Sequence, residues 1–333
     1  MGTLRIHFTA DDLARTTVAA APDPLWEVLL SRFRLRERCL PLAFRPWAER
    51  LRADPARLAR MRPGARLLDV LVPPGPYFPD FLTPAQARLG LEVGLEAMLS
   101  TPRHRLRHEL HLLADHHRLP GWVQPLADGD PTALSGLGHA LRAYHRAAIA
   151  PHHDLIHTAC NAERARRARD LLDGGVEGLL AGLRPLVRWQ PPELQVTYSV
   201  DQVLHLGGRG LHLVPSYFCQ NAPVSLADPH LPPVLIYPID QDCRWTPAAT
   251  DRRDLEALIG KTRTAVLSAL DLAATTTQLA RHLQASPASI SRHTTVLRDA
   301  GLIATHRDGS AVLHTLTPLG TTLLQGRITD PAA

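Results

Sequence analysis

The chain has little lysine, little cysteine and few aromatic residues. Lys261 is the one lysine among 37 basic residues, and aromatic residues make up 5% of the chain. The four cysteines, at positions 39, 160, 219 and 243, stand alone, and isolated cysteines are most often small buried hydrophobic residues. No run of about 18 apolar residues occurs, so we expect no membrane partner. The start of the chain lacks a basic stretch followed by an apolar core, so we expect a cytoplasmic protein.

Length and charge set the scale of the molecule. Its 333 residues, 45% of them hydrophobic, are enough for two or three domains with buried cores. The net charge of +5 is compatible with a polyanionic partner but is too small to establish one. Residues 251–327 carry nine Lys or Arg against six Asp or Glu, an excess of three positive charges. The case for nucleic acid therefore depends on motifs.

The most informative segment begins at Thr275. Thr275 and Gln278 have the spacing of a capping box, in which two side chains cap the first backbone N–H groups of a helix. A short helix is predicted over residues 275–283, and Gln284-Ala285 forms the turn after it. The order of a helix and a tight turn is typical of the first half of a helix-turn-helix.

A second helix is marked at both ends. Ser286 is a preferred N-cap residue, Pro287 fits the first helical position, and Gly301 suits the residue just past the end. Three residues at helical spacing are expected to face the core: Ile290, Thr294 and Leu297. The outward side carries short polar groups and one guanidinium, and its candidate DNA contacts are Ser286, Ala288, Ser289, Ser291, Arg292 and His293. Arginine bonds guanine bidentately and small side chains allow close approach to base edges, whereas the alternative is an ordinary solvated helix face.

A hairpin is predicted next. Residues 302–306 and 311–316 alternate as strands, and Asp308-Gly309 between them is a strong signal for a tight turn. Arg307 and Ser310 flank the tip, where a cation meets phosphate or enters the minor groove. Two capped helices followed by an arginine-bearing hairpin predict a winged helix-turn-helix that binds double-stranded DNA.

The same residues resemble a known family. The stretch from Ser286 to Ile303, then His306-Arg307-Asp308-Gly309 and Leu316-Thr317-Pro318-Leu319-Gly320, is similar to the arsenical-repressor (ArsR/SmtB) family of winged-helix regulators. The resemblance implies that Ser291 and Arg292 meet bases or nearby phosphates, with Ser289 and His293 as neighbours. Thr294 departs from the family's usual Leu. Phrases at 6–15 and 210–219 resemble long actinobacterial regulators of this family.

The metal ligands that the resemblance implies are missing. No cysteine occurs in residues 275–283, and residues 317–327 hold no His, Asp or Glu. We therefore expect no metal and no cofactor. A His-rich metal sensor is the alternative, because helical spacing groups His104, His108 and His111, and also His153 with His157. Arginines surround the first group and would repel a cation, so solvated histidines are the simpler interpretation.

Upstream, the patterning changes near residue 188. Before it, amphipathic runs that begin near a proline predict helices after Asp23-Pro24 and over 84–99, 102–117, 131–148 and 151–172. Leu4, Ile6 and Phe8 alternate as in an edge strand before a helix start at Thr9. Short β-type runs follow at 194–199, 203–206, 210–215 and 234–238.

These patterns predict a mainly α protein with a small β region, an N-terminal helical domain and a C-terminal winged helix-turn-helix. The expected parts are a helical regulatory or dimerisation domain at 1–187, a short-strand sheet region with a linker at 188–245, and the DNA-binding domain at 251–327. No Gly-x-Ser-x-Gly, His-Glu-x-x-His or paired-Cys motif occurs, so we expect no catalytic residues; an enzyme domain fused to the DNA-binding domain is the alternative.

The expected function is that of a sequence-specific regulator of transcription that binds double-stranded DNA. The resemblance implies a homodimer, whose two-fold symmetry would place two second helices in successive major grooves. It also implies a repressor, because most of the family are repressors. An unknown small-molecule effector is a further expected partner, and its signal enters through the upstream part.

Overall fold

The structure is a computed structural model that describes residues 2–37, 40–185, 187–239, 252–270, 273–308 and 311–325. The chain forms two compact units, Met1–Arg244 and Trp245–Ala333. The division predicted near residue 188 lies inside the first unit, because strands that follow it pair with strands from the first 20 residues. The predicted fold class is confirmed: the protein is mainly helical, with little sheet and a C-terminal helix-turn-helix.

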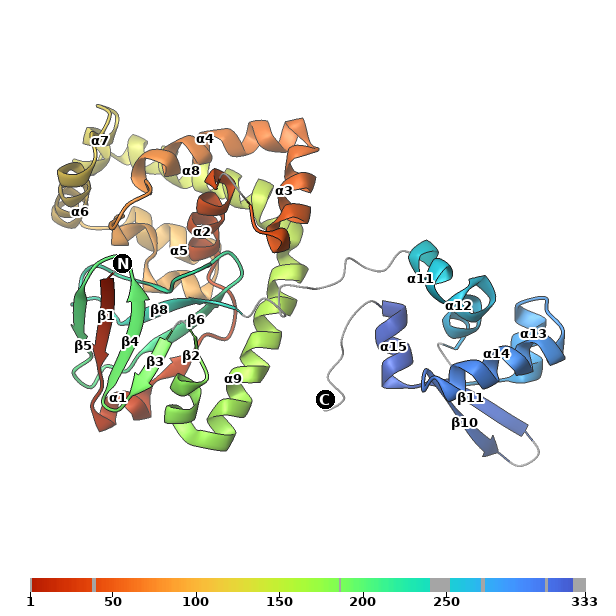
Figure 1. The fold of residues 1–333 in the computed structure, drawn as a ribbon. Coiled ribbons are helices and arrows are strands. Elements are labelled where there is room, and N and C mark those ends of the chain that lie inside the picture. Colours follow the sequence, from red (N-terminus) through yellow and green to blue (C-terminus); the bar gives the residue numbers. More distant parts are fainter. Residues whose placement is uncertain are drawn as a thin grey trace. The chain divides into compact units, whose positions relative to one another are not determined.

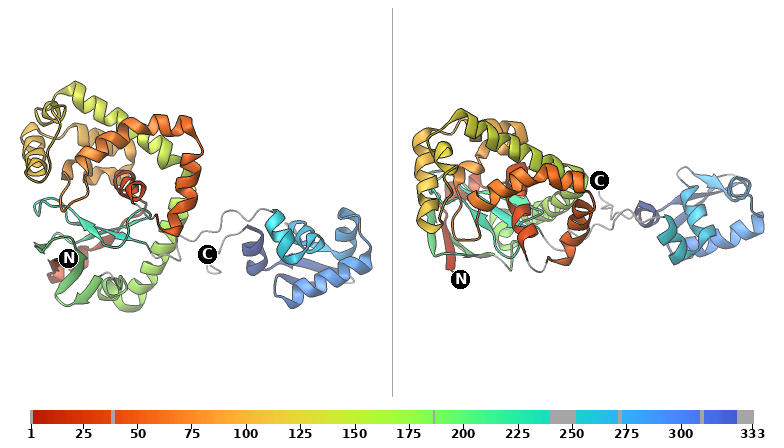
Figure 2. Two further views of the ribbon diagram at one scale, coloured as in Figure 1. Left: turned by 45° about the horizontal axis from the view of Figure 1, so that its top comes forward. Right: turned by 90° about the horizontal axis from the view of Figure 1, so that it is seen from above.

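Helices make up most of the first unit. They are α1 (Ala10–Arg15), α2 (Pro24–Arg36), α3 (Arg45–Arg52), α4 (Pro55–Leu71), α5 (Leu91–Leu99), α6 (Arg103–His116), α7 (Val123–Ala127), α8 (Pro131–Ala148) and α9 (His153–Ala181). Short 3₁₀ helices are η1 (Leu42–Phe44), η2 (Asp80–Leu82), η3 (Ala85–Leu89) and η4 (Ala150–His152). Asp23 caps α2 by accepting the N–H groups of Leu25 and Trp26, as the Asp23-Pro24 pair predicts. Helices α2 to α8 gather on one side of the two sheets (Figures 1 and 2).

Two four-stranded sheets complete this unit. The first has the order β3 (Val187–Gln190), β4 (Glu193–Tyr198), β1 (Gly2–His7), β5 (Gln202–His205). The second has the order β2 (Thr17–Val18), β6 (His212–Ser216), β8 (Val234–Pro238), β7 (Val224–Ser225). The four β-type runs predicted between residues 194 and 238 therefore all form strands.

The second sheet lies between the helices and the first sheet. Successive side chains of a strand point to opposite faces. Leu213 and Leu235 accordingly join the core of the first sheet, whereas their neighbours Val214 and Ile236 join the core of the helices. Strands β6 and β8 thus tie two apolar cores together.

The prediction of an edge strand at Leu4, Ile6 and Phe8 is wrong. Strand β1 is interior, with β4 antiparallel on one side and β5 parallel on the other. Leu4 and Ile6 are fully buried. The alternation did identify a strand, but its neighbours come from residues almost 200 positions later and leave no local signal. The helix start at Thr9 is confirmed by a capping box between Thr9 and Asp12.

The second unit is a small helical domain with a three-stranded sheet. Its elements are α11 (Arg252–Ile259), α12 (Lys261–Ser268), β9 (Ala274–Thr275), α13 (Thr276–His282), α14 (Pro287–Asp299), β10 (Ile303–Asp308), β11 (Ala311–Leu316) and α15 (Pro318–Gln325). Strand β11 is central, between β10 and β9. Residues from α12, α13, α14 and β10 share one apolar core. In Figure 1 helix α14 lies beside the β10–β11 hairpin.

Buried carboxylates hold the second half of the first unit onto its first half. Asp12 accepts the Gly210 N–H at 2.9 Å. Glu27 accepts the N–H groups of Tyr217 at 2.8 Å and Phe218 at 3.1 Å. Asp80 accepts those of Ala227 and Asp228, the latter at 2.8 Å. All three acids are 3% exposed or less, so their oxygens replace water as acceptors for five backbone N–H groups.

Glu27→Gln should destabilise the first unit in a pH-dependent way. Glutamine keeps the shape but offers one acceptor oxygen for two N–H groups, a loss of about 1–3 kcal/mol. Burial raises the pKa of Glu27 from 4.5 to about 7, against the hydrogen bonds from Tyr217 and Phe218. A raised pKa means that this carboxyl stabilises the fold fully below its unfolded pKa and loses that contribution as the pH rises through its folded pKa.

The free-energy difference between wild type and Glu27→Gln is therefore expected to be larger near about pH 5 than near about pH 8. Urea unfolding followed by tryptophan fluorescence measures it at both pH values. Glu49→Gln, at an exposed position on α3, is the matched control and should change stability by less than about 0.5 kcal/mol. A difference that grows toward high pH would contradict the assignment.

Candidate nucleic-acid interface

The first helix of the motif begins as its capping box predicts. Thr275 Oγ1 accepts the Gln278 N–H at 3.2 Å, and Gln278 Oε1 accepts the Thr275 N–H at 2.7 Å. Helix α13 ends at His282, and Gln284 in the following turn has a φ of 50°. The Ala285 N–H returns to the Ala280 carbonyl at 2.9 Å, which closes the turn. The turn predicted at Gln284-Ala285 is confirmed.

Both predicted ends of α14 are confirmed. Ser286 accepts the Ser289 N–H at 3.2 Å, and Pro287 occupies the first turn. At the other end Gly301 has a φ of 71°, which favours glycine. The N–H groups of Gly301 and Leu302 bond the carbonyls of Arg298 and Leu297, both at 2.8 Å. This pair of bonds is a Schellman motif, and it turns the chain from α14 into the hairpin.

The inward side of α14 carries the three residues predicted for it. Ile290, Thr294 and Leu297 are between 0% and 4% exposed. Thr294, where the resembling family has Leu, donates its hydroxyl to the Ser291 carbonyl at 3.0 Å. Because this bond satisfies the hydroxyl inside the helix, the polar side chain is tolerated at a buried position.

The outward side of α14 brings the predicted DNA contacts together. Ser286, Ala288, Ser291 and Arg292 are exposed, and Ser289 and His293 are half-buried. No acidic residue occurs between Ser286 and Arg298. Within the described part of the chain, the Arg292 side chain makes no hydrogen bond or ion pair, whereas Arg298 on the same helix is held by Asp299 at 2.9 Å. The guanidinium of Arg292 is thus available to a ligand.

The wing is only partly described. Strands β10 and β11 pair in register from Ile303 with Leu316 to Asp308 with Ala311. The backbone of Arg307 lies in this ladder opposite Val312. Ser310 lies outside the described residues, as does the side chain of Arg307. Their predicted phosphate or minor-groove contacts stay predictions.

A buried histidine joins the wing to the helix-turn-helix. His314 on β11 is 5% exposed, and its two ring nitrogens lie 3.0 Å from the hydroxyls of Thr276 on α13 and Thr305 on β10. Burial lowers the pKa of His314, and the charge of Arg298 lowers it further. The neutral ring therefore couples three elements through two hydrogen bonds.

The phrase from Leu316 to Gly320 also has a structural reason. Thr317 donates its hydroxyl to the Gly301 carbonyl at 2.6 Å and accepts the Gly320 N–H at 3.1 Å, so it caps α15. A Cβ added to Gly320 would lie 2.0 Å from the Leu302 carbonyl oxygen. Glycine is required because α15 packs directly on the corner between α14 and β10.

Two further exposed side chains near this surface were not predicted from the sequence. Thr295 is exposed one turn after Ser291 and Arg292, and its hydroxyl donates to the Ser291 carbonyl at 2.9 Å. Its i+4 and i+3 spacing to those residues is the signal that would have identified it. Arg281, in the last turn of α13, is also exposed.

The other sequence candidates lie in the first unit. His104, His108 and His111 are exposed on α6, and the rings of His153 and His157 on α9 lie 3.9 Å apart. No three His, Cys, Asp or Glu side chains among the described residues are placed to hold a metal ion. Cys160 and Cys219 are buried, and Cys39 and Cys243 lie outside the described residues. None of the helices in the described ranges is long and apolar enough to cross a membrane.

Two capped helices at a tight turn, followed by a hairpin packed on the second helix, define a winged helix-turn-helix of the DNA-binding type. Residues 260–305 match the family model described as bacterial regulatory protein, arsR family. The matched range runs from the start of α12 into β10 and includes all of α14. No curated protein and no solved structure matches the chain. The match supports a DNA-binding regulator of transcription with an ArsR-type helix-turn-helix.

Gly320→Ala should loosen the second unit. The added methyl group meets a backbone carbonyl that cannot move aside without shifting the α14–β10 corner, so the loss is expected to be about 3 kcal/mol or more. Hydrogen–deuterium exchange should show reduced amide protection in α14, β10 and α15 of the full chain. Leu319→Ala, on the same helix at a side chain 56% exposed, is the control and should leave protection unchanged. Equal protection in both variants would refute the close packing.

Proposed function

We propose that the chain is a sequence-specific, double-stranded DNA-binding repressor that acts as a homodimer. Helix α14 enters the major groove, and the β10–β11 hairpin follows the adjacent backbone. The observation that carries this proposal is the outward side of α14. It combines a guanidinium at Arg292 that has no partner among the described residues, small side chains at Ala288, Ser289 and Ser291, and no carboxylate.

Roles on this surface follow from the length and chemistry of each side chain. Arg292 is long enough to bond a guanine at two atoms. Ser286 and Ser289 stand at the helix N-terminus, where free N–H groups and hydroxyls suit a phosphate oxygen. His293 and Thr295 flank Arg292 and extend the same surface. Arg307 and Ser310 of the wing would position the domain rather than select sequence.

The remaining parts of the proposal concern assembly and control. Two-fold symmetry of a dimer would set two half-sites about one helical turn apart, or a multiple of it. The match to the arsR family model supports repression and dimerisation, which are common in that family. A bacterial regulator that binds DNA acts in the cytoplasm. No metal is invoked. The first unit, with its own cores and cavities, is where a small-molecule effector would bind.

Arg292→Ala is expected to weaken binding to the selected operator by about 1–3 kcal/mol, because one bidentate base contact is lost. The operator is first obtained by selecting genomic fragments with the wild-type protein and sequencing them. Affinities are then measured by fluorescence anisotropy at fixed salt for the selected fragment and for a scrambled one. Binding to the scrambled fragment should change much less, because it depends on phosphate contacts.

Arg298→Ala is the matched control on the same helix. It removes the same charge, but its guanidinium is already held by Asp299, so specific binding should fall by less than about 0.5 kcal/mol. If Arg298→Ala weakens operator binding as much as Arg292→Ala does, both arginines contribute only positive charge. The base contact assigned to Arg292 is then wrong. If no genomic fragment is enriched at all, the proposal of a sequence-specific regulator fails.

A further inference from the structure

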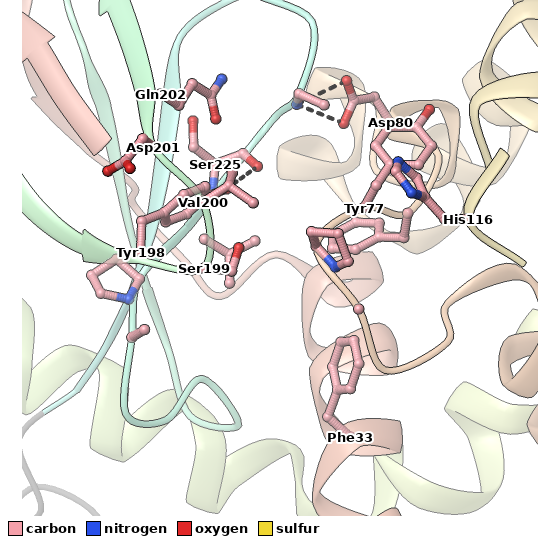
Figure 3. A pocket seen from close by; sticks show the side chains of 17 residues that line it. Phe33, Tyr77, Asp80, His116, Tyr198, Ser199, Val200, Asp201, Gln202 and Ser225 are labelled. Atoms are coloured by element: carbon pink, nitrogen blue, oxygen red, sulfur yellow. Dashed lines mark hydrogen bonds between the residues drawn. The ribbon is translucent and has the colours of Figure 1, made fainter. Parts of the chain in front are cut away.

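A cavity of about 440 Å³ opens in the first unit between the helices and the sheets. In Figure 3 residues Tyr198 to Gln202 and Ser225 lie on one side of it, and Tyr77, Asp80 and His116 lie on the other. Phe33, near the end of α2, stands below them. The volume is within the usual range for a small-molecule site, about 300–1,000 Å³.

The lining differs from the rest of the protein in two respects. Four of its 17 residues are Phe or Tyr (Phe33, Tyr77, Phe78 and Tyr198), whereas aromatic residues make up 5% of the chain. None of the described residues that line it is a Lys or Arg, although the chain has 37 of them. Its acidic side chains are those of Asp80 and Asp201, and His116 is its titratable base among the described residues. An aromatic wall with two carboxylates favours a positively charged, partly apolar molecule.

Asp80 is the more buried of the two carboxylates in the lining. It is 3% exposed, and its hydrogen bonds come from the N–H groups of Ala227 and Asp228. Among the described residues, Asp80, Asp201 and Asp228 form no ion pair. Burial raises the pKa of Asp80 to about 6, and its charge raises the pKa values of Tyr77 and Tyr198, to which burial contributes most. The cavity walls therefore carry negative charge that no ion pair within the described part of the chain neutralises.

The fold already places one cation on an aromatic ring of this lining. The Arg36 guanidinium lies 4.7 Å from the centre of the Phe33 ring, and its charge is shared with Asp69 at 3.6 Å. On the other side, Arg105 is paired with Glu109. Both guanidiniums are thus engaged outside the lining. Burial and the charge of Glu109 raise the pKa of Asp80, whereas the charge of Arg105 lowers it.

We propose that this cavity binds a small amphipathic cation, with the ammonium group at Asp80 and the apolar part against Tyr77, Phe78 and Tyr198. Asp201, an exposed residue that also accepts the Thr3 N–H at 2.9 Å, lies at the rim and attracts the same charge. Binding at this site is independent of whether the second unit binds DNA.

Isothermal titration calorimetry on the full chain tests the proposal with three probes of one shape. These are 4-phenylbutylamine, 4-phenyl-1-butanol and 4-phenylbutanoate, which differ in charge at one end. The amine is expected to bind one molecule per chain, about tenfold more tightly than the alcohol, because its charged donor meets a buried carboxylate. The carboxylate probe should bind most weakly.

Variants then locate the site. Asp80→Asn should weaken the amine about tenfold and leave the alcohol nearly unchanged, a charge-specific result that a general loosening would not produce. Tyr77→Leu should weaken both probes, whereas Tyr77→Phe, which keeps the ring, should retain binding of the amine. Asp201→Asn keeps the acceptor oxygen for Thr3 and should weaken the amine about threefold, so a test remains if Asp80→Asn does not fold.

Glu96→Gln is the charge-matched control, because Glu96 is exposed on α5 and does not line the cavity. It should leave all three affinities unchanged. The proposal is overturned if the amine and the carboxylate probe bind equally, or if the amine does not bind up to about 1 mM. It is also overturned if the affinity for the amine is the same in wild type, Tyr77→Leu and Asp201→Asn.

Discussion

The first unit depends on carboxylates that accept backbone N–H groups out of contact with water. Asp12, Glu27 and Asp80 come from the first quarter of the chain, and their donors lie between Gly210 and Asp228. The segment that carries these donors enters and leaves the second sheet, and past the strand ends its N–H groups have no ladder partners. An unpaired buried N–H costs about 1–3 kcal/mol, so each acid removes a penalty that the fold would otherwise carry. Packing of the two apolar cores on this sheet therefore requires the three acids to be in place.

Several helix starts could be predicted because their causes are local, although the run at 84–99 forms η3 and α5 rather than one helix. The capping boxes at Thr9 and Thr275, and the cap-then-proline pairs at Asp23 and Ser286, satisfy N–H groups two or three residues away. The apolar spacing in α14 likewise identified Ile290, Thr294 and Leu297 as its buried side. These signals predicted α13, α14 and the hairpin of the winged domain, whose partners are close in sequence, but not α11, α12 or β9.

The first unit could not be predicted to the same depth, because its partners are far apart. Strand β1 pairs with strands almost 200 residues later, so no sequence pattern near β1 indicated that it lies inside the sheet. The acceptors for Tyr217 and Phe218 could be any acids in the chain until the fold brings Glu27 there. The same holds for the cavity, whose lining comes from five separate stretches between Phe33 and Ala227. Spacing along the chain predicts helices and turns, whereas this site is made by tertiary contacts.

Asp80 has two roles that oppose each other when the cavity is empty. As an acceptor for Ala227 and Asp228 it must be ionised to be most effective, but burial raises its pKa to about 6 and so disfavours the charge. A cation at Asp80 would resolve this conflict, because an opposite charge favours the ionised form. A ligand present at 100 times its dissociation constant adds about 2.7 kcal/mol to the stability of the state that binds it. Ligand binding in the cavity would then stabilise residues 222–228 and the second sheet first. A signal carried by such a cation would need no metal. It would act through Asp80, a residue whose hydrogen bonds the fold requires.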